Sequence, residues 1–149
     1  IAGSEVVTGS SAHRAARWDK YQARGGEWPY ERWSKMYENN MSRATNAHAA
    51  VDDYHAALGW GRREVTVDVE IDGVAYSRRI DIADVRLQRG VEYKTGYQTA
   101  NADNIWEILR DSSLMEQGWD IQWILRDRAS KPLLEQLRNA GIPYKVGKQ

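Results

Sequence analysis

Alternating apolar and polar residues predict a group of strands in the middle of the chain. Residues 65–71 alternate strictly, which is typical of a half-buried strand. Asp72-Gly73 then favours a tight hairpin turn, because both positions of such a turn take positive backbone φ angles. A second strand is expected at 74–83, a polar turn at 84–90 and a third strand at 91–95. These segments together predict a three-stranded antiparallel meander.

The period of two along these strands predicts which side chains share a face. On the second strand, Ile80 and Ile82 are expected on one face, and Asp81 on the other. A turn centred on residues 86–87 then places Asp81 directly opposite Glu92 of the third strand. Directly opposed residues have Cβ atoms roughly 4.5–5.5 Å apart. The two carboxylates are therefore expected within reach of one ion.

Helical periodicity predicts helices before and after the meander. Three- and four-residue steps on a long helix at 29–58 place a run of apolar residues and two histidines on one stripe, namely Trp33, Tyr37, Met41, Ala44, His48, Val51, His55 and Leu58. The remaining elements are expected as helices at 12–23, 99–117 and 130–139 and strands at 119–125 and 142–146. This order predicts an α/β fold in which helices flank a mixed central sheet.

The chain is 149 residues long, which suits one domain with a helical attachment. We expect residues 1–60 to form an N-terminal linker and a helical segment that packs on the core. Residues 61–149 are expected to form the core itself. The chain begins with Ile1 rather than methionine, which predicts a fragment or a processed product of a longer protein.

The spacing of Asp81, Glu92 and Lys94 is typical of metal-dependent phosphodiester cleavage. Two carboxylates can hold a hard divalent cation through oxygen. A lysine beside them can position or activate the attacking water. Most Glu-x-Lys triplets are instead ion pairs on a solvated face, so the aspartate in register and the apolar neighbours carry the interpretation.

At these residues the chain resembles the PD-(D/E)xK nuclease superfamily. The segments Arg78-Arg79-Ile80-Asp81-Ile82 and Val91-Glu92-Tyr93-Lys94-Thr95-Gly96 carry the resemblance, although no proline precedes Asp81. Asp81 matches the lone acid, and Glu92 and Lys94 match the E-x-K pair. The resemblance implies a restriction-endonuclease-like core with an N-terminal helical segment. It also implies that Asp81, Glu92 and the Tyr93 carbonyl bind Mg²⁺ or Mn²⁺.

Within the superfamily, these segments look most like the toxin branch. The resemblance then implies a DNase effector domain of a larger secreted toxin, acting in the cytoplasm of a competing bacterial cell. A cognate immunity protein is the expected partner, and no membrane contact is expected. Two alternatives stay open: an RNase toxin that cuts transfer RNA, and a non-catalytic partner-binding module.

Several further residues are candidates for auxiliary roles. Arg79 and Thr95 are expected to contact nucleic acid, DNA more than RNA. Gln98 is a candidate for the scissile region, or a structural amide. Glu38 is a candidate for the metal shell, or a solvent-exposed acid. For His48 and His55, we weigh a phosphate or leaving-group contact against partial burial with hydrogen bonds in a helix–sheet interface.

Composition narrows these alternatives. The 21 basic and 21 acidic residues give no net charge, so any basic footprint for nucleic acid must be local. The lack of cysteine excludes disulfides and thiol chemistry and removes the usual zinc ligands. No run of about 18 apolar residues occurs, so no membrane span is expected.

Overall fold

The structure is a computed structural model that describes residues 7–147. The chain divides into two compact units, with the division between His48 and Ala49. This division falls inside one long helix, so each unit receives one end of it. Residues 1–6, the first part of the expected N-terminal linker, lie outside the described residues.

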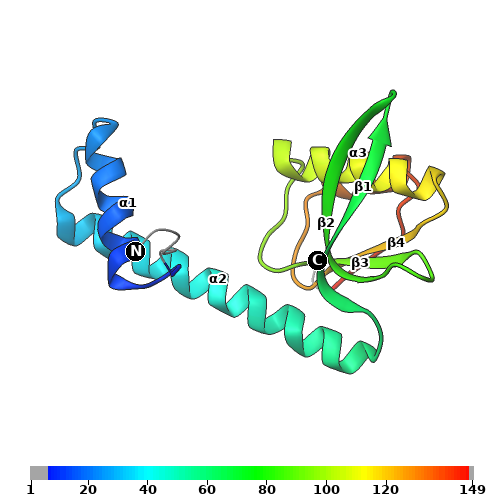
Figure 1. Cartoon of the computed structure of the whole chain (residues 1–149), viewed down its shortest axis with the longest axis horizontal. Coiled ribbons are helices and arrows are strands. Elements are labelled where there is room, and N and C mark those ends of the chain that lie inside the picture. The colour runs from blue at the N-terminus through cyan, green and yellow to red at the C-terminus, as the bar shows by residue number, and fades with distance from the viewer. Residues whose placement is uncertain (1–6, 148–149) are drawn as a thin grey trace, which may run out of the picture. The chain divides into compact units, whose positions relative to one another are not determined.

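The first unit consists of α1 (Ser11–Ala23) and the first part of α2 (Tyr30–Leu58) (Figure 1). The Ser10 side chain caps α1 by accepting a hydrogen bond from the backbone N–H of His13. Aromatic rings from both helices pack together, and Trp33 and Tyr37 are buried. The predicted helices at 12–23 and 29–58 are therefore confirmed.

The second unit is built on a five-stranded mixed sheet in the order β1-β2-β3-β4-β5. The first three strands form the predicted antiparallel meander, and the last two strands add parallel to β3. The strands are β1 (Arg62–Ile71), β2 (Val74–Asp84), β3 (Arg89–Lys94), β4 (Asp120–Leu125) and β5 (Tyr144–Val146) (Figure 1). Asp72 and Gly73 both have positive φ angles, as the predicted hairpin turn requires.

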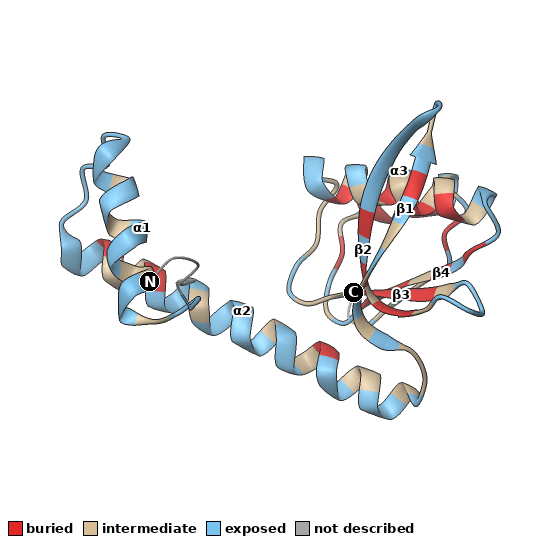
Figure 2. Cartoon of the chain, viewed as in Figure 1, coloured by how far each residue is buried: buried red, intermediate tan, exposed pale blue. Residues whose placement is uncertain are grey.

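Helices cover both faces of this sheet. One face packs against α3 (Ala102–Glu116) and α4 (Lys131–Asn139), with side chains such as Leu114 and Leu137 in the main core. Asn101 and Ser130 cap these two helices through their side chains. The other face packs against the end of α2 through Val51. Figure 2 shows the buried residues of β3, β4 and the inner side of α3 in red.

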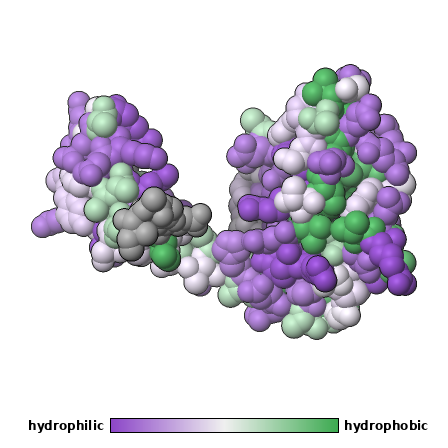
Figure 3. Space-filling view, viewed as in Figure 1, coloured by the Kyte–Doolittle hydropathy of each residue, from purple (hydrophilic) through white to green (hydrophobic). Residues whose placement is uncertain are grey.

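These elements confirm an α/β fold with a mixed sheet and flanking helices. Within residues 7–147, no helix is both long and apolar enough to cross a membrane. On the surface, apolar side chains gather at the tip of the β1–β2 hairpin, the upper end of the second unit in Figure 3. Val74 at this tip is 51% exposed.

The expectation that Ile80 and Ile82 share a face is wrong. Ile80 packs in the core with α3 and α4, whereas Ile82 packs on the other face with Val51. The pairing of β1 with β2 skips Asp81 and its partner position Glu64, and Glu64 has a φ of 53°. This left-handed residue interrupts the alternation, so β2 changes faces at Asp81.

The apolar stripe predicted along α2 is also only partly correct. Trp33 and Tyr37 are buried in the first unit and Val51 in the second. Ala44 and His48 between them are exposed. The predicted partial burial of His48 is therefore wrong, because its side chain is exposed.

Candidate active site

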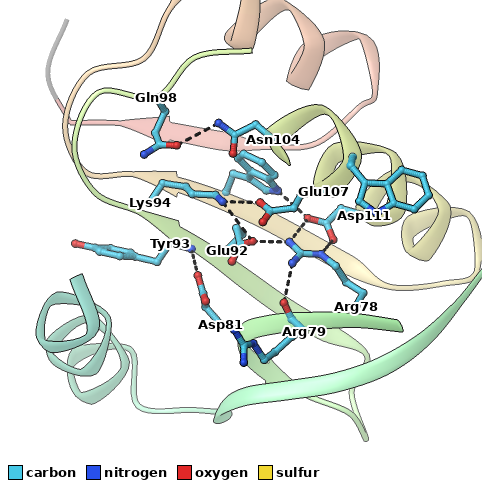
Figure 4. Close-up of polar contacts among 12 residues, drawn as sticks. Arg78, Arg79, Asp81, Glu92, Tyr93, Lys94, Gln98, Asn104, Glu107 and Asp111 are labelled. Atoms are coloured by element: carbon cyan, nitrogen blue, oxygen red, sulfur yellow. Dashed lines mark hydrogen bonds and ion pairs between the residues drawn. The ribbon is translucent and has the colours of Figure 1, made fainter. Parts of the chain in front are cut away.

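A polar cleft opens on the second unit between β2, β3 and α3. It has a volume of about 310 Å³ and is lined almost entirely by charged side chains. The lining residues are Arg78, Arg79, Asp81, Glu92, Tyr93, Lys94, Glu107 and Arg110. All of them except Arg110 are labelled in Figure 4. Asp81, Glu92 and Lys94 thus line one cleft, as their spacing in the sequence predicts.

The register of β2 and β3 brings Asp81 and Glu92 together. The pairing of the two strands ends at Ile82 and Val91, and Asp81 and Glu92 are the next residues beyond that pair. Asp81 also accepts a hydrogen bond at Oδ2 from the backbone N–H of Tyr93, at 2.8 Å. This bond fixes the Asp81 carboxylate at the point where β2 changes faces (Figure 4).

A buried ion-pair network holds Glu92 from the opposite side. Arg78 donates from Nη2 to Oε2 of Glu92 at 2.5 Å and from Nε to Oδ1 of Asp111 at 2.8 Å. The indole Nε1–H of Trp123 donates to Oδ2 of Asp111, also at 2.8 Å. All four side chains are buried, so one arginine charge is shared between two carboxylates away from water.

Lys94 lies at the edge of this network. Its Nζ is 2.5 Å from Oε2 of Glu107 on α3 and 3.9 Å from Oε2 of Glu92. The ammonium also lies 5.3 Å from the ring centroid of Trp123. The Lys94 side chain is only 18% exposed, so it is less solvated than an ordinary surface lysine.

Burial and neighbouring charges raise the pKa values of two acids in the cleft. Burial raises the pKa of Glu92 to about 8, and hydrogen bonding and charge from Asp81 add to the rise against the effect of Arg78. Burial and the charge of Glu92 likewise raise the pKa of Glu107, although Lys94 opposes this. For Arg78, burial would lower the pKa, but Glu92 and Asp111 outweigh it and raise the pKa.

The donor set of the cleft fits a hard cation that keeps part of its water shell. Asp81 and Glu92 offer two facing carboxylates, and Mg²⁺ is commonly held by one or two carboxylates together with water and substrate phosphate. Burial is the main cause of the raised pKa of Glu92, and hydrogen bonding and charge from Asp81 add to it. A cation between the two carboxylates would offset the part that comes from Asp81. Within residues 7–147, no group of three or more His, Cys, Asp or Glu side chains is arranged to enclose a metal ion.

The residues after Lys94 have mainly structural contacts. Gln98 donates from Nε2 to the Thr95 carbonyl at 2.8 Å and accepts from Asn104 at 3.1 Å, and its backbone bridges to Ala129. Gly96 has a φ of 77°, which explains the glycine, and open space lies around it. These contacts agree with the structural alternative for Gln98, and its contact with the scissile region stays a prediction.

The two predicted nucleic-acid contacts, Arg79 and Thr95, differ in position. Arg79 is exposed and lines the cleft, while its carbonyl accepts a 2.7 Å hydrogen bond from Nη1 of Arg78. Thr95 is half-buried and lies directly after the end of β3. Their contact with nucleic acid stays a prediction.

The three remaining candidates, Glu38, His48 and His55, are not among the residues that line the cleft. Glu38 is exposed and forms an ion pair with Arg14 at 3.0 Å in the first unit, as the solvent-exposed alternative expects. His48 belongs to the same unit as Glu38. The auxiliary roles proposed for these two residues stay predictions. His55 is half-buried, and its Nε2 lies 2.7 Å from the Gly61 carbonyl, as the structural alternative expects.

Sequence reasoning missed Glu107, Asp111 and Arg110, and it gave Arg78 no special place. A signal was present for Asp111, because it lies three residues after Ile108 and three before Leu114, both buried. A charge on the apolar stripe of a helix needs a buried partner. Nothing in the sequence identified Arg78 rather than Arg79 as that partner.

Comparison of the chain with models of known protein families, with curated proteins and with solved structures found no match.

Proposed function

We propose that the second unit is a metal-dependent endonuclease with a restriction-endonuclease-like core, and that Asp81, Glu92 and Lys94 are its catalytic residues. The observation that carries the proposal is the convergence of these three side chains on one polar cleft. They come from two strands, and a paired register brings them together. The Asp…Glu-x-Lys pattern and the resemblance to the PD-(D/E)xK superfamily point in the same direction.

The acids are proposed as the metal ligands. Asp81, Glu92 and the Tyr93 carbonyl would hold Mg²⁺ or Mn²⁺, which supplies positive charge to the phosphate oxygens and lowers the pKa of the attacking water. The hydrogen bond from the Tyr93 N–H orients Asp81, and the Arg78 bond orients Glu92. Arg78 is thus proposed as a positioning residue, since its side chain is buried and bonded to Glu92 and Asp111.

Lys94 is proposed to orient the water and to stabilise the negative charge that develops on the phosphate. Its contact with Glu107 holds the ammonium in the cleft. Arg79 and Arg110 line the same cleft, and Arg79 is exposed, so they supply the local positive charge that a chain without net charge needs.

The biological setting is proposed from the resemblance alone. The domain would be the DNase effector of a larger secreted bacterial toxin that acts in the target-cell cytoplasm. A cognate immunity protein would protect the producer by blocking the cleft. RNA, including transfer RNA, is the nearest alternative substrate.

The test is incubation of the purified chain with supercoiled plasmid, and separately with total RNA, in Mg²⁺ and in EDTA. Cleavage should require Mg²⁺ or Mn²⁺, stop in EDTA and return when Mg²⁺ is added in excess. The Asp81→Asn variant should lose both cleavage and the rise in melting temperature that Mg²⁺ gives the wild type. Undiminished cleavage in EDTA would contradict the metal-dependent mechanism.

A second candidate function is a non-catalytic partner-binding module. The observation that favours it is the contact of Glu92 with Arg78, which already gives one Glu92 oxygen a buried partner inside the protein. In that case neither DNA nor RNA is cleaved under any metal condition, and Mg²⁺ leaves the melting temperature of the chain unchanged.

A further inference from the structure

Two exposed aromatic rings lie beside the cleft. Tyr76 on β2 and Trp106 on α3 are each 37% exposed, and their rings meet edge to face with centroids 5.1 Å apart. The Arg110 guanidinium lies 5.1 Å from the Trp106 centroid and donates from Nη1 to the Ser77 carbonyl at 3.0 Å. We call Tyr76, Trp106 and Arg110 the aromatic platform.

The platform is continuous with the cleft. Arg110 belongs to both, because it lines the cleft and stacks over Trp106. Glu107, which holds Lys94, directly follows Trp106 on α3. On the strand side, Tyr76 lies two residues from Arg78, or about 7 Å along β2. A nucleic-acid strand with one phosphate in the cleft therefore has a neighbouring nucleotide within reach of the platform.

We propose that the aromatic platform stacks an unpaired base next to the phosphate that enters the cleft, so that the preferred substrate is single-stranded or locally unpaired nucleic acid. The proposal deepens the proposed nuclease function and rests on it for the path of the strand. In a duplex each base face is covered by its neighbours, so only an unpaired or flipped base can stack on a protein ring. Arg110 adds a cation for the adjacent phosphate and a planar stacking surface.

The chain contains a natural control for this platform. Trp28, in the first unit, is also 37% exposed and also carries an arginine over its ring, with Arg32 4.3 Å from the centroid. If any exposed tryptophan–arginine pair bound bases, the two sites would behave alike. The proposal instead requires that Trp106 matters and Trp28 does not, because Trp106 carries Arg110 of the cleft over its ring, whereas Trp28 carries Arg32, which is not a lining residue of the cleft.

The experiment measures binding of fluorescent oligonucleotides by anisotropy in EDTA, where metal-dependent cleavage cannot occur. The probes are oligodeoxythymidine, oligouridine, an abasic strand of the same length and a DNA duplex. The abasic strand keeps the phosphates but lacks bases, so its comparison with oligodeoxythymidine isolates stacking. The wild-type chain should bind oligodeoxythymidine or oligouridine about tenfold more tightly than the abasic strand.

The variants decide the location of the stacking. Trp106→Ala should remove the preference for bases over the abasic strand, and Trp106→Phe should keep part of it. Trp28→Ala should keep all of it, and thermal melting should show that each variant is folded. Equal effects of Trp106→Ala on the abasic and base-containing strands would overturn the proposal, as would tighter binding of the duplex than of every single strand.

The two proposals can fail separately. Loss of cleavage in every metal condition, with the base preference at Trp106 intact, would reject the nuclease and leave the platform as a binding site. Metal-dependent cleavage with no base preference would reject the platform and leave the nuclease. The relative binding of oligodeoxythymidine and oligouridine then shows whether the platform favours DNA or RNA.

Discussion

Lys94 is bonded to Glu107 rather than to Glu92. Its Nζ is 2.5 Å from Oε2 of Glu107 but 3.9 Å from Oε2 of Glu92, two residues away on the same strand. A helix acid therefore fixes the ammonium of the Glu-x-Lys pair, and the strand acid remains bonded to Arg78. Because Lys94 bonds to Glu107 and not to Glu92, it does not stand between the carboxyl groups of Glu92 and Asp81.

The first prediction concerns Glu107 as the residue that positions Lys94. Glu107→Gln keeps the shape of the side chain but removes its charge, so the Lys94 ammonium is freed to turn toward Glu92. We expect kcat on a cleavable oligonucleotide to fall about tenfold with little change in KM, since the loss is one of orientation. The matched control is Glu116→Gln, an exposed acid on the same helix. An unchanged kcat would remove Glu107 from the site.

The second prediction separates chemistry from folding at Lys94. Lys94→Ala should reduce cleavage about a hundredfold to a thousandfold, because it removes positive charge from the transition state. The free energy of unfolding should fall by only about 1 kcal/mol, the upper range for a partly exposed ion pair. Lys145→Ala, an exposed lysine on β5, should change neither quantity. A Lys94→Ala domain with full activity would end the nuclease assignment.

The third prediction concerns the buried arginine. Arg78→Met should lower the free energy of unfolding by about 3–5 kcal/mol in urea titrations, because Glu92 and Asp111 lose their shared buried partner. Arg79→Met, at the exposed neighbouring position, should change stability by less than about 0.5 kcal/mol. Equal effects of the two substitutions would contradict the buried network.

The fourth prediction is a pH dependence of stability. The pKa of Glu92 rises from 4.5 to about 8 on folding, so between these values the folded chain holds a proton that the unfolded chain releases. The contribution of Glu92 to the free energy of unfolding is therefore greatest below about pH 4.5. It declines as the pH rises toward 8, by at most ~1.4 kcal/mol per pH unit. Glu107 acts in the same direction.

The measurement is unfolding at several pH values without and with Mg²⁺. Glu92→Gln should flatten the decline, because the amide cannot lose a proton. If Glu92 is a metal ligand, Mg²⁺ should stabilise the wild type more at pH 8 than at pH 5.5, since the ion competes with the proton. A stability that rises with pH between 5 and 8 in wild type but not in Glu92→Gln would contradict the raised pKa.

Local patterns in the sequence determined most of the fold. The period of two, the Asp72-Gly73 turn and the helix-capping residues Asn101 and Ser130 act within a few residues of each other. Their signals therefore survive without tertiary information. The same local logic placed Asp81 opposite Glu92, because the length of the turn sets the register of the hairpin.

The tertiary structure alone decided how the carboxylates are paired. Glu64 adopts a left-handed conformation that turns β2 over at Asp81, so Arg78 and not Arg79 enters the buried side with Glu92. Glu107 and Asp111 reach the cleft because α3 packs on the sheet with that side inward. No local sequence pattern indicates either arrangement, because each depends on contacts between elements far apart in the chain. The sequence by itself thus determined which acids and lysine meet, and packing decided what holds them.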